Sequence, residues 1–177
     1  MSGTSVENRE AQRKSLIMTL QSCLRKPLTN YGEAKEGSMA IKNYTTEVDV
    51  YKSLGEIQAA LASHGARKIM VDYDAVGQPI GVMFAIETPN GPRGFCLPAN
   101  VDGVRAVFDQ QKVKAKPGQA ERTAWRNIRD WIMAQMAIIE AGQVQLEEVF
   151  LPYLTDNRGK TLYQLYRGGQ LALEGGS

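Results

Sequence analysis

Three strand-like runs separated by short turns are the feature that most constrains the fold of this chain. They cover about residues 67–74, 79–87 and 93–97, and apolar side chains alternate along the first two. The last two runs are joined by Thr88-Pro-Asn-Gly-Pro92, whose Asn-Gly pair is a strong signal for a hairpin turn. The sequence therefore predicts a small antiparallel sheet.

Helical spacing of apolar residues surrounds these runs. We predict helices from a Ser53–Glu56 capping box to Gly65, from an Asn100 cap to about 112, over 119–141, over about 144–151, and from a Thr161–Gln164 capping box to Arg167. A further strand is expected over 41–51, with Tyr44, Thr46, Val48 and Val50 on one face. The order is β-α-β-β-β followed by a C-terminal group of helices, one of them long, which is an α+β fold.

The first 38 residues differ in character from the rest and hold one expected helix, about 5–25. We interpret Met39 as a natural start, since Lys35-Glu36-Gly37 can be encoded by a ribosome-binding sequence; the alternative is that Gly37-Ser38 ends an added segment. A single domain is expected over 39–170, followed by a loose tail over 171–177.

The counts of reactive side chains argue against an enzyme. The chain has 177 residues but one His, His64, and two Cys, Cys23 and Cys96, without a zinc-type or catalytic spacing. An enzyme therefore ranks third among the function classes, and we expect no catalytic residue, metal or cofactor. The absence of a signal-peptide pattern or a long apolar stretch predicts reduced thiols, a cytoplasmic location and no membrane partner.

The distribution of charge is more informative than the net charge of +2. Residues 39–177 hold fifteen basic and fifteen acidic side chains, yet 112–129 carries six basic residues against Glu121 alone. The six are Lys112, Lys114, Lys116, Arg122, Arg126 and Arg129. The three arginines are spaced i, i+4, i+7 and share one helix face, opposite an apolar stripe that includes Trp125 and Ile132. This segment is the candidate site for nucleic acid or another anionic partner.

A simpler interpretation is that this face is only solvated and is neutralised within the chain. The acidic residues available for that role are Asp130, Glu140, Glu147 and Glu148. Aromatic residues for base stacking exist on the sheet, at Tyr73, Phe84 and Phe95, but the alternation predicts that most are buried.

Three weaker candidates have stronger structural explanations. Asp72, Asp74 and Glu87 could hold Mg²⁺, but an exposed polar sheet face is favoured. His64 is interpreted as a helix cap before Gly65. Arg158-Gly-Lys-Thr161 resembles the end of a phosphate-binding loop, but Leu154 stands where the pattern needs Gly.

From Tyr44 onward the chain resembles a family of small, mostly uncharacterised proteins encoded by prophages and mobile elements of Gram-positive bacteria. The matching segments include Gly55-Glu-Ile-Gln58, His64-Gly-Ala-Arg-Lys-Ile-Met70, Thr88-Pro-Asn-Gly-Pro-Arg-Gly94, Leu97-Pro-Ala-Asn-Val101, Val149-Phe-Leu-Pro-Tyr153 and Thr161-Leu-Tyr163. They cover nearly all of 40–170, and the resemblance implies an intracellular, phage-associated role without adding a catalytic motif.

Two function classes are expected. The first is a non-enzymatic phage accessory protein that binds nucleic acid through the six basic residues. Single-stranded nucleic acid is one option for this ligand. The alternative is a protein-binding inhibitor of a host defence system, such as an anti-CRISPR, which the neutral domain favours. A homodimer seam at Trp131, Met133 and Met136 of the long helix also stays open.

Overall fold

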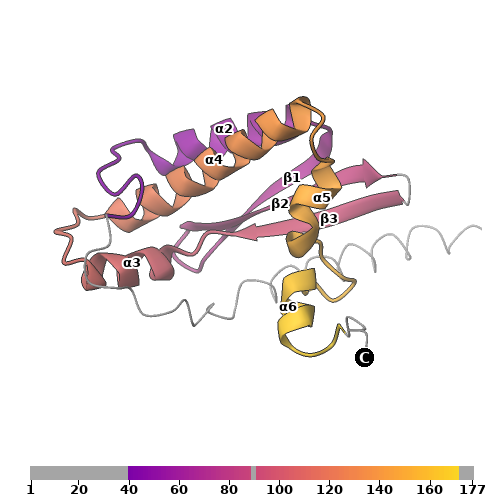
Figure 1. Ribbon diagram of the computed structural model, residues 1–177. Helices are drawn as coiled ribbons and strands as arrows, with labels where there is room; N and C mark the ends of the chain where they lie inside the picture. Colours follow the sequence, from indigo (N-terminus) through magenta and orange to yellow (C-terminus); the bar gives the residue numbers. More distant parts are fainter. Residues whose placement is uncertain (1–39, 89–90, 172–177) are drawn as a thin grey trace, which may run out of the picture.

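The computed structural model describes residues 40–88 and 91–171, which form a three-stranded antiparallel sheet and a set of helices (Figure 1). The elements are α2 (Val50–Ser63), β1 (Ala66–Tyr73), β2 (Pro79–Thr88), β3 (Gly91–Pro98), α3 (Val101–Gln110), α4 (Gln119–Glu140), α5 (Leu146–Phe150), the 3-10 turn η1 (Leu151–Tyr153) and α6 (Leu162–Arg167). The predicted α+β class and the long helix are confirmed. The helix expected over 5–25 and the tail from 172 lie outside the described residues.

The sheet has the order β1-β2-β3, and one of its faces carries the main core. Val82, Phe84 and Ile86 of β2 are all buried on this face, as the alternation predicts. Phe84 lies opposite Phe95 of β3 in the register, and the two rings stack with centroids 5.1 Å apart. On the other face Met83 lies opposite Cys96, and both are buried.

Helices α2 and α4 lie side by side over the core face of the sheet, and α5 covers one end of it (Figure 1). The predicted apolar stripe of α4 is confirmed, because Trp125, Ile132 and Met136 are buried in this core. The Trp125 indole N–H also donates to the carbonyl oxygen of Pro79 at 3.2 Å, which satisfies its polar atom.

The apolar flank of α4 that suggested a homodimer seam is covered within the chain. Trp131 packs edge-on against Phe150 of α5, with ring centroids 5.4 Å apart, and against Tyr153 of η1 at 5.7 Å. Met136 is buried in the main core. The short helix after Gly142 therefore supplies the cover that one small sheet does not.

The strand predicted over 41–51 is wrong. Residues 42–45 form a turn, in which Asn43 has a φ of +63° and the Thr46 amide donates to the Asn43 carbonyl oxygen. Asn tolerates this left-handed conformation better than most residues. Its side chain also bonds to α4, so tertiary contacts hold the turn.

The Ser53 capping box is also wrong, because α2 begins one turn earlier. Asp49 is the N-cap, and its side chain accepts from the Tyr51 amide at 2.8 Å. Ser53 is consequently fully buried inside the helix, and its hydroxyl has no hydrogen-bond partner. Glu56 is free to face α4 instead of capping α2.

The other local signals are confirmed. Gly65, with a φ of +96°, follows the C-cap His64. Asn100 caps α3 by accepting from the Gly103 amide, and Thr161 and Gln164 form the predicted capping box of α6. The helix predicted over about 144–151 is divided between α5 and η1, since Pro152 sits in the 3-10 turn.

Candidate nucleic-acid interface

The six candidate basic residues lie on two elements, the loop between α3 and α4 and the first half of α4. We call residues 111–118 the lysine loop, since it holds Lys112, Lys114 and Lys116. The loop projects at one end of the domain (Figure 1). The lysines differ from Arg126 and Arg129 in their partners: the two arginines pair with acidic side chains of the same chain, and the lysines are weakly paired.

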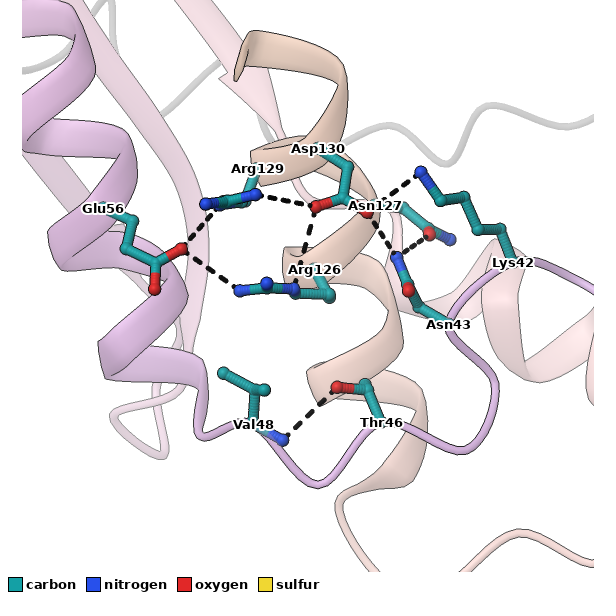
Figure 2. A network of polar contacts seen from close by, with 9 residues as sticks. All are labelled: Lys42, Asn43, Thr46, Val48, Glu56, Arg126, Asn127, Arg129 and Asp130. Carbon is teal, nitrogen blue, oxygen red and sulfur yellow. Dashed lines mark hydrogen bonds and ion pairs between the residues drawn. The ribbon is translucent and has the colours of Figure 1, made fainter. Parts of the chain in front are cut away.

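Arg126 and Arg129 are neutralised by acidic side chains of the same chain. Glu56 of α2 accepts from Arg126 Nη1 at 3.1 Å and from Arg129 Nε at 2.5 Å, both through its Oε2 atom (Figure 2). Asp130 accepts from Arg129 Nη1 at 3.2 Å and lies 3.7 Å from Arg126 Nε. The two arginines join α2 to α4 and are not free to bind a phosphate.

Asp130 is held in its charged form by the turn that replaces the predicted strand. Its Oδ2 atom lies 2.9 Å from Lys42 Nζ and accepts from Asn43 Nδ2 at 3.0 Å (Figure 2). Burial raises the pKa of Asp130, but bonds from Asn43, Lys42 and Arg129 outweigh it and lower the pKa to about 2. The network therefore contributes stability at neutral pH.

The pKa of Glu56 is lowered by the same type of contact. Partial burial acts to raise it, and the hydrogen bonds and charges of Arg129 and Arg126 lower it further than burial raises it. The sequence analysis named Asp130 as an acidic partner but missed Glu56, which is 70 positions before Arg126. The sequence pattern around Glu56 suggested only a capping role in its own helix, and nothing in it indicated a contact with α4.

Arg122 differs from the other two arginines because it meets only neutral acceptors. Its Nη2 atom donates to the Pro117 carbonyl oxygen at 3.2 Å and to Gln119 Oε1 at 3.0 Å. No carboxylate of residues 40–88 or 91–171 lies within 4.0 Å of its guanidinium nitrogens. These two bonds hold the end of the lysine loop against the first turn of α4.

The lysine loop begins in a Schellman-type helix end, two residues before the end predicted from sequence. The Val113 amide donates to the Phe108 carbonyl oxygen and the Lys112 amide to that of Asp109. Val113 packs against the cluster that contains Phe108. Lys112 takes the left-handed position of this motif, with a φ of +52°, where Gly is usual.

The lysines of this loop are exposed and weakly paired. Within the part of the chain that the structure describes, Lys112 and Lys114 make no ion pair and no side-chain hydrogen bond. Lys116 Nζ lies 2.7 Å from Glu47 Oε1, but both side chains are more than two-thirds exposed. Such a pair contributes little and separates easily in solvent.

An open depression of about 350 Å³ lies beside the loop and the start of α4. Lys116, Gly118 and Arg105 line it, together with Glu121, which pairs with Arg105. The N-cap Gly118 supplies no side chain to bond the first amides of α4. The positive end of the helix dipole therefore adds to the charge of Lys116 at this place.

The weaker candidates of the sequence do not form sites. No three His, Cys, Asp or Glu side chains of the described residues gather as a metal site, and Asp74 instead accepts from the Val76 and Gln78 amides of its turn. The expected capping role of His64 is confirmed, since its Nδ1 atom lies 2.7 Å from the Ala60 carbonyl oxygen. Its Nε2 atom lies 3.0 Å from Glu140.

The loop before Thr161 is closed by its own aspartate. Asp156 Oδ1 accepts from the amides of Arg158 and Lys160, both at 2.8 Å. These amides are therefore not available to a phosphate, which agrees with the capping interpretation of Thr161.

No protein-family model, curated protein or solved structure matches this chain. The resemblance to prophage proteins accordingly stays a prediction. Among the described residues no helix combines the length and the hydrophobicity needed to cross a membrane.

Proposed function

We propose that this protein binds nucleic acid without catalysing a reaction, and that the lysine loop contacts the phosphate backbone. The observation that carries the proposal is the exposure of Lys112 and Lys114, which have no acidic partner among the described residues. Lys116 follows them in the same loop, and Arg122 bonds to the carbonyl oxygen of Pro117 at the end of that loop. Lys116 lines the depression beside the uncapped N-terminus of α4, where an anion is favoured.

The binding is expected to be independent of base sequence. Lysine acts as a point charge, which suits contacts with phosphate and carries no base information. Of the three candidates for base stacking, Phe84 and Phe95 are almost completely buried in the core, whereas Tyr73 is 46% exposed but lies at the end of β1, on a different element from the lysine loop. The interaction therefore depends on charge and weakens steeply as salt rises. Such an accessory role in the cytoplasm fits the phage-type proteins that the sequence resembles.

The test is a titration of fluorescent single-stranded and double-stranded oligonucleotides at 50 and 200 mM salt. The matched variant is Lys112→Asn/Lys114→Gln/Lys116→Gln, because Asn tolerates the left-handed backbone at position 112. We expect binding at low salt that the variant loses. Absence of binding by the wild-type protein at 50 mM salt would refute the proposal.

A second candidate function, a protein-binding inhibitor of host defence, is favoured by an aromatic depression on another surface. Trp131, Tyr153 and Ile128 line a shallow depression of about 270 Å³ together with Leu97 and Pro98. Trp and Tyr in such depressions often dominate protein-protein binding energy. Recovery of one nuclease in fixed ratio from a bacterial lysate, lost in Tyr153→Ala, would favour this candidate over the first.

A further inference from the structure

The outer edge of β1 has no partner strand among residues 40–88 and 91–171. In the order β1-β2-β3 the two edge strands are β1 and β3. The β3 edge is partly closed, because Phe95 bridges to Leu154 and the Thr155 amide donates to the Gly94 carbonyl oxygen at 2.9 Å. Within residues 40–88 and 91–171, backbone pairing of β1 involves β2 alone. Half of its amides and carbonyls therefore point outward as a template for another strand.

From this edge we propose that two copies of the protein pair through β1, antiparallel, to give one continuous six-stranded sheet. A twofold axis perpendicular to the sheet sets one residue of β1 opposite its own copy. The paired stretch of β1 is bounded by irregularities, between Ala66 and Lys68 and between Asp72 and Tyr73. The regular part, 68–72, is centred on Met70. An axis at Met70 thus pairs all five regular residues.

This register brings opposite charges together. In it Lys68 lies opposite Asp72 of the second copy, and symmetry repeats the pair on the other side of the axis. Directly opposite side chains of an antiparallel pair share one face, so both charges lie on the face away from the helices, as the β2 partners Ala85 and Gly81 indicate. Lysine on an edge strand usually prevents strand pairing, but here a carboxylate neutralises it.

The apolar residues of β1 fit the same register. Met70 is 43% exposed, unusual for a sheet methionine, and would pack against Met70 of the second copy. Ile69 and Val71 lie on the core face, where they are only partly buried, and would lie opposite each other. An axis at Ile69 would instead set Lys68 opposite Met70, and an axis at Val71 would set Met70 opposite Asp72. Only the register centred on Met70 sets opposite charges against each other and apolar side chains against apolar side chains.

The flank of α2 leaves room for the second copy. Tyr51, Gly55, Gln58 and Ala62 are spaced i, i+4, i+7, i+11 and form one stripe. The stripe lies on a different side of α2 from Glu56, which faces α4. Gly55 and Ala62 are exposed and small, and a Cβ at Gly55 would meet nothing within 4 Å. A helix of the second copy can therefore approach this side of α2 closely.

The test is the oligomeric state of the full chain with a charge swap across the seam. Sedimentation equilibrium at 5–100 μM should give a mass approaching twice 19.5 kDa. Lys68→Asp and Asp72→Lys should each be monomeric, because like charges then face each other, and the double variant should restore the dimer. Unchanged circular dichroism and melting in each variant separate loss of pairing from loss of fold.

A cross-link tests the register directly. Met70→Cys should form a disulfide-linked dimer on oxidation, since the axis sets position 70 opposite itself. Val76→Cys is the control, because Val76 is 79% exposed but lies beyond β1. A wild-type monomer at 100 μM, single reversals that stay dimeric, or a double variant that stays monomeric would overturn the proposal. Neither the charge swap nor the cross-link depends on nucleic-acid binding by the lysine loop.

Discussion

Replacing Asp130 by Asn tests whether the charge network between α2, α4 and the turn at 42–45 stabilises the domain. Asn keeps the shape of the side chain but removes the charge that Lys42 and Arg129 contact. The lowering of the pKa of Asp130 from 3.8 to about 2 corresponds to about 2 kcal/mol of stability at neutral pH. We expect Asp130→Asn to lose this amount, a decrease in Tm of roughly 5–10 °C for a domain of this size.

The pH dependence gives the prediction its sign. The pKa of Asp130 is lower in the folded state than in the unfolded chain, so its stabilisation is complete above pH 4. It is lost as the pH falls through about 4 to about 2. The difference between wild-type and Asp130→Asn should therefore shrink over this range and stay constant from pH 5 to 7.

Urea unfolding followed by the fluorescence of Trp125 and Trp131 measures both effects. The matched control is Asp102→Asn, because Asp102 also pairs with an arginine but its side chain is 85% exposed. This control should be indistinguishable from wild type, as expected for an exposed pair. Equal losses in the two variants, or a loss for Asp130→Asn that is the same at pH 7 and pH 2.5, would refute the reasoning.

Two further predictions concern single residues of the helices. Ser53→Ala should raise the free energy of unfolding by about 1 kcal/mol in urea titrations, because it removes a buried hydroxyl without a partner; a loss of stability would show that the hydroxyl is satisfied. Lys112→Gly should relieve roughly 1 kcal/mol of backbone strain, since Gly favours the left-handed conformation, and should therefore raise the Tm measured by calorimetry. An unchanged or lower Tm would argue against the Schellman-type end of α3.

Elements with a strong local signal were predictable from the sequence, and those decided by contacts distant in the chain were not. The strands follow from the alternation of apolar residues and from the turns between them. Asn100 and Thr161 were predictable as helix caps because each bonds to an amide only three residues further along the chain. The alternation over 41–51 failed because Asn43 bonds to Asn127 and Asp130, more than eighty positions away. Tertiary contacts there override a weak local preference.

The candidate site shows the same division. The spacing of the arginines correctly predicted one face of α4, but not that Glu56 of α2 would occupy that face. Helix pairing determines this contact, and the sequence of neither helix alone reveals it. Within residues 40–88 and 91–171, the lysine loop makes one ion pair, between Lys116 and the exposed Glu47, and nothing in the sequence indicated that contact.

The salt dependence of oligonucleotide binding tests the central claim most directly, namely that the lysine loop and not the arginine pair of α4 contacts phosphate. For single strands each contact contributes a slope of about 0.7 in a plot of log affinity against log salt. Lys112→Asn/Lys114→Gln/Lys116→Gln should reduce the slope by about 2, while Arg129→Gln should leave the slope unchanged and lower only the stability. A slope that falls with Arg129→Gln but not with the lysine variant would contradict the account.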